Sequence, residues 1–301
     1  MYQAIYIQQG ENYAKTVHLK DDNEGWLHFD YKPTYYKLNP NGELKTLDGK
    51  RVSPTDCYSK DNYEIDIPNE TRVLIEQYLE EDEPPKWHNI VFLDIECEIG
   101  GALTPENIKN SPTKITSIAL YDKSTEQTIC YILDESKSME SFEENGKSII
   151  ACYTEKELLL KFLDKWDEIE PTIVVGWNSE FFDIPYLYFR MLKVFDHNTA
   201  KRLSPLGIIG NLSKYGSVAT IETQKLTKDY LDLAGINHLD YFNLFKKYIT
   251  KQEPSYKLGD IGKKYVGLDK IKYDVSLDKL FKEDKAKFIE YNIRDVEILI
   301  E

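Results

Sequence analysis

Apolar and polar residues alternate along residues 90–98, Ile-Val-Phe-Leu-Asp-Ile-Glu-Cys-Glu, in a pattern that predicts a buried strand carrying acids. Side chains alternate across a strand, so Asp94 and Glu96 share one face while Leu93 and Ile95 pack on the other. Two adjacent carboxylates in a poorly solvated place repel each other and need a proton, a basic side chain or a divalent cation. The alternative is an edge strand whose acids point into water.

Two further strands are predicted over residues 114–121 and 127–133, and the short polar connection between them suits an antiparallel hairpin. Residues 154–170 have helical periodicity, with Thr154 and Glu157 in capping-box spacing. Residues 172–177 form the next strand. This succession predicts a right-handed crossover onto a mixed sheet covered by helices.

Asp183 follows that strand in the run Asn178-Ser-Glu-Phe-Phe-Asp183-Ile-Pro185. Because Pro185 suits the first turn of a helix, Asp183 is well placed to cap that helix. The carboxyl ends of strands in an α/β sheet are also where ligands collect. The local pattern favours the cap and leaves a functional role open.

The last segment, residues 284–301, is predicted to be a helix with two distinct faces. One is an apolar stripe that contains Ile289, Ile293 and Val296. Tyr291 and Asp295, at positions i and i+4, lie side by side on roughly the opposite face. An exposed Tyr–Asp neighbour pair is the alternative interpretation of this spacing.

The first part of the chain has a different pattern. Short Tyr-rich strand candidates, such as residues 4–7 and 26–29, alternate with turn signals up to about residue 63, and a short helix follows over residues 71–80. The acidic run at residues 80–83 and Pro84-Pro85 then interrupt regular structure. These features predict a small β-rich module with a domain boundary after it.

Composition places the chain among globular proteins. It has 301 residues, 41% of them hydrophobic, and lacks both an apolar run of about 18 residues and a signal-peptide pattern, so a cytosolic location is expected. The four cysteines form no C-x-x-C pair and the five histidines no H-E-x-x-H motif, which argues against structural zinc and disulfides. The net charge is −14, but residues 190–275 hold 15 Lys or Arg against 9 Asp or Glu. This local surplus of basic residues is compatible with a nucleic-acid partner. The alternative is an uneven distribution of charge that arose by chance.

The acids fall in three short motifs, which stand in the chain as Asp94-Ile-Glu96, Asn178-x-x-x-Phe182-Asp183-x-x-Tyr-Leu and Tyr291-x-x-x-Asp295. Their order and spacing resemble the three exonuclease motifs of family B DNA polymerases. Further short runs are similar to the T-even bacteriophage replicative polymerases: Gly176-Trp177-Asn178, Thr199-Ala-Lys-Arg-Leu-Ser-Pro205, Leu239-Asp240-Tyr241 and Gln252-x-Pro254-Ser255-Tyr256. The resemblance covers nearly the whole chain and is carried mainly by residues after 88.

The resemblance implies an α/β (α+β) fold: a ribonuclease H-like exonuclease domain over residues 89–301, with a mixed sheet flanked by helices, after a β-rich N-terminal domain over residues 1–88. It also implies a 3′→5′ proofreading exonuclease that releases dNMP and uses two Mg²⁺ or Mn²⁺ ions. Four carboxylates can hold two such ions about 4 Å apart for an in-line displacement.

By the same resemblance, Asp94, Glu96 and Asp295 would hold the ion that carries the attacking water. Asp94 would bridge to a second ion held by Asp183. Tyr291, whose phenol stays protonated at neutral pH, would orient the water or the scissile phosphate. The expected metal ligands are therefore Asp94, Glu96, Asp183 and Asp295.

Asn178 and Phe182 are the expected DNA contacts in the second motif, with Phe182 stacking on a base. Between residues 207 and 230 the family carries a β-hairpin that helps to part primer from template. Tyr215, followed by Gly216, is the candidate turn of that hairpin and the third expected DNA contact. Asp240 is expected to support the residues that bind the metal without binding the metal itself.

The polymerase palm motifs S-L-Y-P-S and D-T-D-S are absent from this sequence. We therefore expect a polymerase part beyond Glu301, as the rest of a longer chain or as a separate subunit, and no primer extension by this chain alone. Expected partners are single-stranded 3′ DNA ends, that polymerase part and, through it, a sliding clamp. No membrane partner is expected, and the location would be the cytosol of an infected host cell if the source is viral.

Two other functions compete with this interpretation. One is a free-standing exonuclease of the related DEDD class that trims RNA or DNA, against which the extra N-terminal module argues. The other is a non-catalytic scaffold of a replication assembly. The presence of all four carboxylates and Tyr291 argues against a scaffold, because a non-catalytic protein does not need these five polar groups around one pocket.

Overall fold

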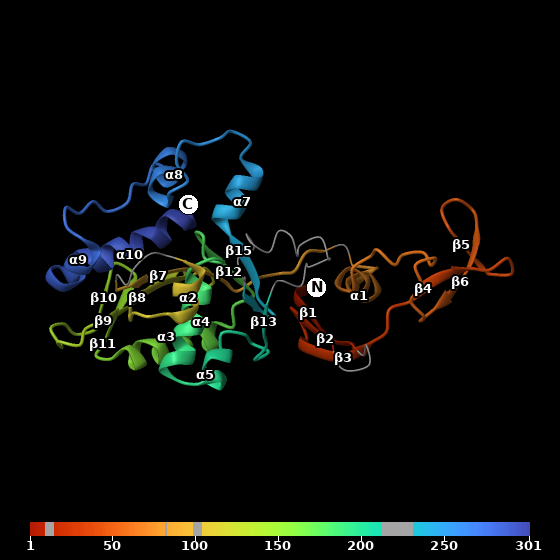
Figure 1. Ribbon diagram of the computed structural model, residues 1–301, viewed down its shortest axis with the longest axis horizontal. Helices are drawn as coiled ribbons and strands as arrows, with labels where there is room; N and C mark the ends of the chain where they lie inside the picture. Colours follow the sequence, from red (N-terminus) through yellow and green to blue (C-terminus); the bar gives the residue numbers. More distant parts are fainter. Residues whose placement is uncertain (10–14, 82, 99–103, 212–230) are drawn as a thin grey trace. The chain divides into compact units, whose positions relative to one another are not determined.

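The computed structural model of the chain describes residues 1–9, 15–81, 83–98, 104–211 and 231–301 (Figure 1). These residues divide into two compact units, Met1–Trp87 and His88–Glu301. Within the described ranges, each helix is too short or too polar to cross a membrane.

The first unit is built from short antiparallel strands and one helix. Its two sheets have the orders β1-β2-β3 and β4-β6-β5. Val17 and Leu19 of β2 pack against Val73 of α1 in a small apolar core. The elements are β1 (Tyr2–Gln9), β2 (Lys15–Asp21), β3 (Gly25–Tyr31), β4 (Tyr35–Leu38), β5 (Leu44–Lys45), β6 (Arg51–Thr55) and α1 (Asn69–Tyr78). The predicted strands at residues 4–7 and 26–29 and the helix near residues 71–80 are present.

The second unit is organised around a seven-stranded mixed sheet of order β10-β11-β9-β8-β7-β12-β15 within the described residues. β7, β8 and β9 run antiparallel to one another, whereas β12 is parallel to both β7 and β15. The strands are β7 (Ile90–Cys97), β8 (Ile115–Asp122), β9 (Gln127–Leu133), β10 (Phe142–Glu144), β11 (Lys147–Cys152), β12 (Ile173–Gly176) and β15 (Asn237–Asp240), with β13 (Ile209–Asn211) and β14 (Leu231–Leu233) paired apart from them.

Helices cover both faces of this sheet, so the predicted mixed sheet flanked by helices is confirmed (Figure 1). The green helices lie on one face and the blue helices α8, α9 and α10 on the other. The helix bounds are α2 (Pro105–Asn110), α3 (Glu155–Ile169), α4 (Asp183–Val194), α5 (His197–Lys201), α7 (Tyr241–Tyr248), α8 (Leu258–Tyr265), α9 (Leu277–Glu283) and α10 (Lys285–Ile300).

Two apolar layers sandwich the central strand β7. Leu93 and Ile95 belong to the layer that α3 and α4 complete, whereas Phe92 belongs to the layer on the α10 side. The predicted alternation of residues 90–98 is therefore confirmed. It follows that the even-numbered positions of β7, including 94 and 96, face α10.

The ends of α3 and α10 follow from their sequences. Thr154 Oγ1 accepts a hydrogen bond from the Glu157 backbone nitrogen, as the capping-box spacing predicted, and Glu157 in turn accepts from the Tyr153 nitrogen. Asp284 caps α10 by accepting from the Lys287 nitrogen. β10 and β11, which were not predicted, extend the sheet beyond β9: β11 pairs parallel to β9, and β10 pairs antiparallel to β11.

A buried ion pair ties α3, α4 and β8 together. The Arg190 guanidinium donates to both carboxylate oxygens of Glu155 at 2.7 Å, and Glu155 also accepts from the Ile115 backbone nitrogen at 2.9 Å. Arg190 further donates to the Ser111 carbonyl oxygen. Because each charge is held by several partners, the pair can remain ionised in the interior.

We expect Arg190→Ala to lower the free energy of unfolding by about 3–5 kcal/mol, because it leaves the Glu155 carboxylate buried without its cation. Urea unfolding followed by circular dichroism measures the change. Arg202→Ala is the matched control: Arg202 bonds Asp164 and Asp167 at the surface, and its loss should cost under about 1 kcal/mol. Equal losses from the two substitutions would contradict the structural role of the buried pair.

Candidate functional site

The acids of residues 90–98 lie on an interior strand, because β7 is paired on one side with β8 and on the other with β12. The edge-strand alternative is therefore wrong. Asp94 and Glu96 are half-buried and point to the face that α10 covers. The fold thus brings two acids into a place that water reaches poorly.

α10 supplies the next two groups. Tyr291 and Asp295 are both buried, with Asp295 only 2% exposed, so the interpretation as an exposed pair is also wrong. One carboxylate oxygen from each of Asp94, Glu96 and Asp295 lies within 4.8 Å of the others. Three acids from a strand and a helix therefore converge on one point.

Asp183 joins them from the start of α4. β12 pairs with β7 only as far as Phe92, so it offers no partner to the Ile95 nitrogen further along β7. Asp183, which follows β12 in the chain, takes that place: its Oδ1 accepts a hydrogen bond from the Ile95 nitrogen at 3.0 Å. Phe182, not Asp183, is the N-cap residue of α4, and it makes no side-chain cap. The prediction of Asp183 as a helix cap is therefore wrong.

A glycine makes this close approach possible. A Cβ at Gly176, the last residue of β12, would lie 2.5 Å from both Cβ and Oγ of Ser179 and 3.2 Å from the Leu93 carbonyl oxygen. The next loop therefore turns tightly against β7 only because residue 176 has no side chain.

Burial raises the pKa values of all four acids, and neighbouring carboxylate charges add to this effect for Asp94, Glu96 and Asp183. Burial raises the pKa of Glu96 to about 8, and the nearby Asp295 charge adds to the effect. Burial also raises the pKa of Asp183 to about 7. For Asp94, burial and the charges of Asp295, Asp183 and Glu96 all raise the pKa, and burial raises that of Asp295. Without a cation, several of these groups hold protons near neutral pH.

Lys270 is a member of the site that the sequence analysis missed. Its Nζ contacts Asp295 Oδ2 and lies 3.2 Å from the Tyr291 hydroxyl oxygen. Burial opposes the charge of Lys270, but the Asp295 and Asp94 carboxylates outweigh burial and raise its pKa. Lys270 lies between α8 and α9, in no motif whose spacing could have linked it to the acids.

The remaining predicted residues lie in or behind the loop that leads to Asp183. Asn178 adopts a positive φ of 62°, and its nitrogen donates to Asp240 Oδ1 at 3.0 Å. Asp240 also accepts from the Glu180 nitrogen and caps α7. Asp240 therefore fixes the loop, while the Phe182 ring packs 5.4 Å from that of Tyr186. Tyr215 and most of the expected hairpin at residues 207–230 lie outside the described residues.

A hollow of about 630 Å³ opens onto the cluster. Asp94 and Asp295 line it together with Trp177, Phe242, Tyr256 and Lys257. Aromatic and basic side chains therefore stand beside the acids, the combination that suits a nucleic-acid strand.

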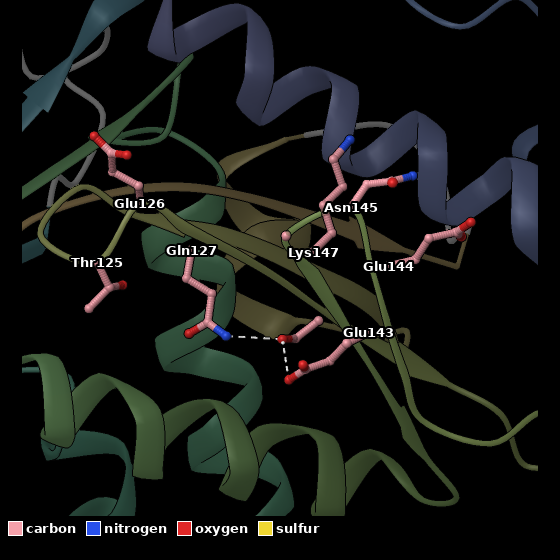
Figure 2. A pocket seen from close by; sticks show the side chains of 9 residues that line it. Thr125, Glu126, Gln127, Glu143, Glu144, Asn145 and Lys147 are labelled. Atoms are coloured by element: carbon pink, nitrogen blue, oxygen red, sulfur yellow. Dashed lines mark hydrogen bonds between the residues drawn. The ribbon is translucent and has the colours of Figure 1, made fainter.

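A second hollow, of about 530 Å³, lies at the edge of the sheet between the turn after β8 and the β10–β11 hairpin. In Figure 2, Gln127 and Glu143 are joined through the hydroxyl of Ser148, while the Glu126 and Glu144 carboxylates point apart. Because its acids do not converge, we take the cluster around Asp94 as the candidate site.

The donor set of that cluster fits a divalent cation. Among the described residues, Asp295 Oδ1 is buried and accepts no hydrogen bond, which is costly unless a cation or proton meets it. Carboxylate oxygens are the ligands that Mg²⁺ and Mn²⁺ prefer. Asp94, Glu96 and Asp295 can therefore hold one ion, while Asp183 lies beside this triad, bound to the backbone next to Asp94.

Comparison with known families decides the classification. The family model for DNA polymerase family B, exonuclease domain, matches residues 31–261, which include Asp94, Glu96 and Asp183. The chain belongs to this family. The ribonuclease H-like fold class follows, and the third motif, with Tyr291 and Asp295, lies after the matched range.

The relatives of this chain include DNA polymerases of phages and archaea. The DNA-directed DNA polymerase of Escherichia phage RB69 is 40% identical over 142 residues, 47% of this chain and 15% of the relative. That of Enterobacteria phage T4 is 30% identical over 143 residues, 48% of this chain and 15% of the relative. DNA polymerase 1 of Saccharolobus solfataricus is 26% identical over 302 residues, 96% of this chain and 30% of the relative. The matches thus span 15% to 30% of the length of these relatives.

The raised acid pKa values predict how the stability of the metal-free protein depends on pH. The folded chain keeps the Glu96 proton up to about pH 8, whereas the unfolded chain releases it near the ordinary value of 4.5. Between these values the folded state binds more protons, so the free energy of unfolding falls as pH rises. Glu96→Gln should reduce the decrease in the free energy of unfolding as pH rises, because glutamine carries no proton to lose. The variant should therefore be more stable than wild type at pH 8.5, but not at pH 4.5.

Thermal unfolding in EDTA across this pH range measures the effect. Glu283→Gln, at an exposed acid of α9, is the control and should follow the wild-type profile. A Glu96→Gln profile that runs parallel to wild type would contradict the assigned burial of the Glu96 charge.

Proposed function

We propose that this chain is a metal-dependent 3′→5′ exonuclease that removes nucleotides from DNA 3′ ends, the proofreading portion of a replicative polymerase. The convergence of Asp94, Glu96, Asp183 and Asp295 beside Tyr291 is the observation that carries the proposal. Family membership and the phage relatives support it. The proposed cofactor is two Mg²⁺ or Mn²⁺ ions.

The proposed roles follow from position. Asp94, Glu96 and Asp295 would hold one ion, and Asp94 and Asp183 the other. The bound ions would supply an acidified water and neutralise charge on the phosphate. The water oxygen would bond to phosphorus while the bond from phosphorus to the 3′ oxygen breaks. A proton from the water would end on that 3′ oxygen, and a nucleoside 5′-monophosphate would leave.

Tyr291 would act as a hydrogen-bond donor to the water or phosphate. Burial and the Asp295 charge raise the pKa of its phenol, so the proton stays on the oxygen at neutral pH. Lys270 Nζ donates to the same hydroxyl oxygen at 3.2 Å, which restricts the direction in which the hydroxyl proton points.

The remaining proposals concern substrate, partners and organisation. Asn178, Phe182 and Tyr215 would contact a single-stranded 3′ end, and a polymerase part, with a sliding clamp reached through it, would complete the assembly in the host cytoplasm. We also propose a β-rich domain over residues 1–88 and an exonuclease domain over residues 89–301. The division of the structure at Trp87 and His88 supports these bounds.

We expect Asp94→Ala to fold and to lose about 10³-fold or more in nuclease rate, because Asp94 would touch both ions. Tyr291→Phe should lose about tenfold, the value of one orienting hydrogen bond. The assay is stepwise shortening of a 5′-labelled oligonucleotide from its 3′ end with Mg²⁺, and with EDTA as the metal-free comparison.

Glu143→Ala, at an acid outside the cluster, is the matched control and should retain wild-type activity. Full activity in Asp94→Ala, or cleavage that persists in EDTA, would refute the proposed chemistry. A protein without activity that still binds a polymerase part would favour the scaffold function instead.

Single-stranded 3′ ends should be cut faster than paired ends, because parting the terminal nucleotides from a duplex costs a few kcal/mol. Rates on a single strand, a paired end and a mismatched end of the same sequence measure this preference. The mismatched end should fall between the other two, and cleavage should weaken with added salt. Equal rates on paired and single-stranded ends would contradict a substrate that must be unpaired.

A further inference from the structure

A buried asparagine links the proposed metal ligands of β7 and α10. Asn292 follows Tyr291 in α10 and is completely buried. Its Nδ2 donates a hydrogen bond to Asp94 Oδ2 at 2.7 Å. Among the described residues, Asn292 is the one side chain that donates to the Asp94 carboxylate.

Ser117 of β8 holds the other end of the same amide. Its hydroxyl donates to Asn292 Oδ1 at 2.6 Å, and Ser117 is also completely buried. Cys130 Sγ, on β9, lies 3.3 Å from the Ser117 hydroxyl. The contacts therefore run from Cys130 and Ser117 through Asn292 to Asp94, across three strands and a helix.

The direction of these bonds follows from chemistry. With a cation bound, the Asp94 carboxylate is ionised and only accepts hydrogen bonds, so the amide must turn its NH₂ group toward Asp94. The amide oxygen then faces Ser117, whose hydroxyl can donate to it. Rotating the amide by half a turn would set its oxygen against the carboxylate, so the carboxylate itself opposes that rotation. The Ser117 hydroxyl donates to the amide oxygen and so holds the amide in the orientation that the carboxylate requires.

We propose that Asn292, oriented by Ser117, is a positioning residue that holds the Asp94 carboxylate for divalent-cation binding. Fixing one oxygen of Asp94 fixes the plane of the carboxylate and therefore the direction in which its remaining lone pairs point. The same bond fastens β7 to the helix that carries Asp295. This inference rests on the proposed function in that the cluster must bind a cation.

A merely structural hydrogen bond would give a different result. Removing any buried hydrogen bond lowers the free energy of unfolding, wherever the bond lies. A positioning bond must in addition change the affinity for the cation, since groups that orient metal ligands typically contribute 10-fold to 100-fold to metal affinity. Cation affinity is therefore the decisive readout.

The experiment is a calorimetric titration of the 301-residue chain with Mn²⁺ in the absence of DNA. Asn292→Leu, which keeps the volume and removes both bonds, should bind Mn²⁺ about 10-fold to 100-fold more weakly than wild type. Ser117→Ala should weaken binding by a smaller factor. In the Asn292→Leu background, Ser117→Ala should change nothing further, because its effect passes through Asn292.

Two outcomes would overturn the proposal. One is wild-type Mn²⁺ affinity in Ser117→Ala, a small change that remains informative if Asn292→Leu fails to fold. The other is a Ser117→Ala effect of the same size with and without Asn292. Ser204→Ala is the matched control, since it removes a buried hydroxyl that donates to the Ala234 carbonyl oxygen, and it should leave Mn²⁺ affinity unchanged.

A further variant separates this inference from the proposed function. Asp295→Ala should nearly abolish Mn²⁺ binding. If wild type fails to bind Mn²⁺, or Asp295→Ala binds it as wild type does, the proposed metal site itself is wrong. If Asp295→Ala loses binding while Ser117→Ala and Asn292→Leu keep it, the metal site stands and the positioning role alone is refuted.

Discussion

Mutual repulsion among four carboxylates in a poorly solvated space is the constraint on which the rest of this structure depends. Asp94, Glu96, Asp183 and Asp295 come from a strand and two helices, and folding forces their charges together. Such a cluster costs free energy unless protons or cations neutralise it. Lys270 supplies one positive charge, and burial raises the pKa values of Glu96 and Asp183, which favours protons on these acids when no cation is bound.

The surrounding fold holds the acids in place against that repulsion. β7 is interior, so its acids cannot swing into water as they could on an edge strand. The early end of β12 leaves the Ile95 nitrogen to bind Asp183, and Gly176 permits the tight turn that brings Asp183 there. Polar groups behind the cluster, above all Asp240 and Asn292, fix the backbone and side chains that carry the acids. Stability and preorganisation therefore depend on the same contacts.

The sequence predicted those parts of the site that depend on local periodicity. The period of two along β7 placed Asp94 and Glu96 on one face, and the spacing of four along α10 placed Tyr291 beside Asp295. That these side chains meet in space depends on the tertiary structure, which local periodicity does not reveal. Their meeting was expected from the sequence only because the motifs resemble those of a known family. The local spacing beside Pro185 predicted a helix cap at Asp183. It could not reveal that the carboxylate binds the Ile95 nitrogen, 88 residues away in the chain. Lys270, Ser117 and Asn292 escaped notice because a single Lys, Ser or Asn in a strand, loop or helix has no periodic signal. β10 and β11 were missed as well.

The central claim is that the carboxylates of β7, α4 and α10 form one binding site for divalent cations. A crystal structure of the chain grown with Mn²⁺, with anomalous diffraction recorded from the metal, tests it most directly. The account predicts anomalous peaks between Asp94, Glu96 and Asp295, with a further peak shared by Asp94 and Asp183. A map without peaks at these carboxylates, from crystals that hold Mn²⁺ in excess, would contradict it.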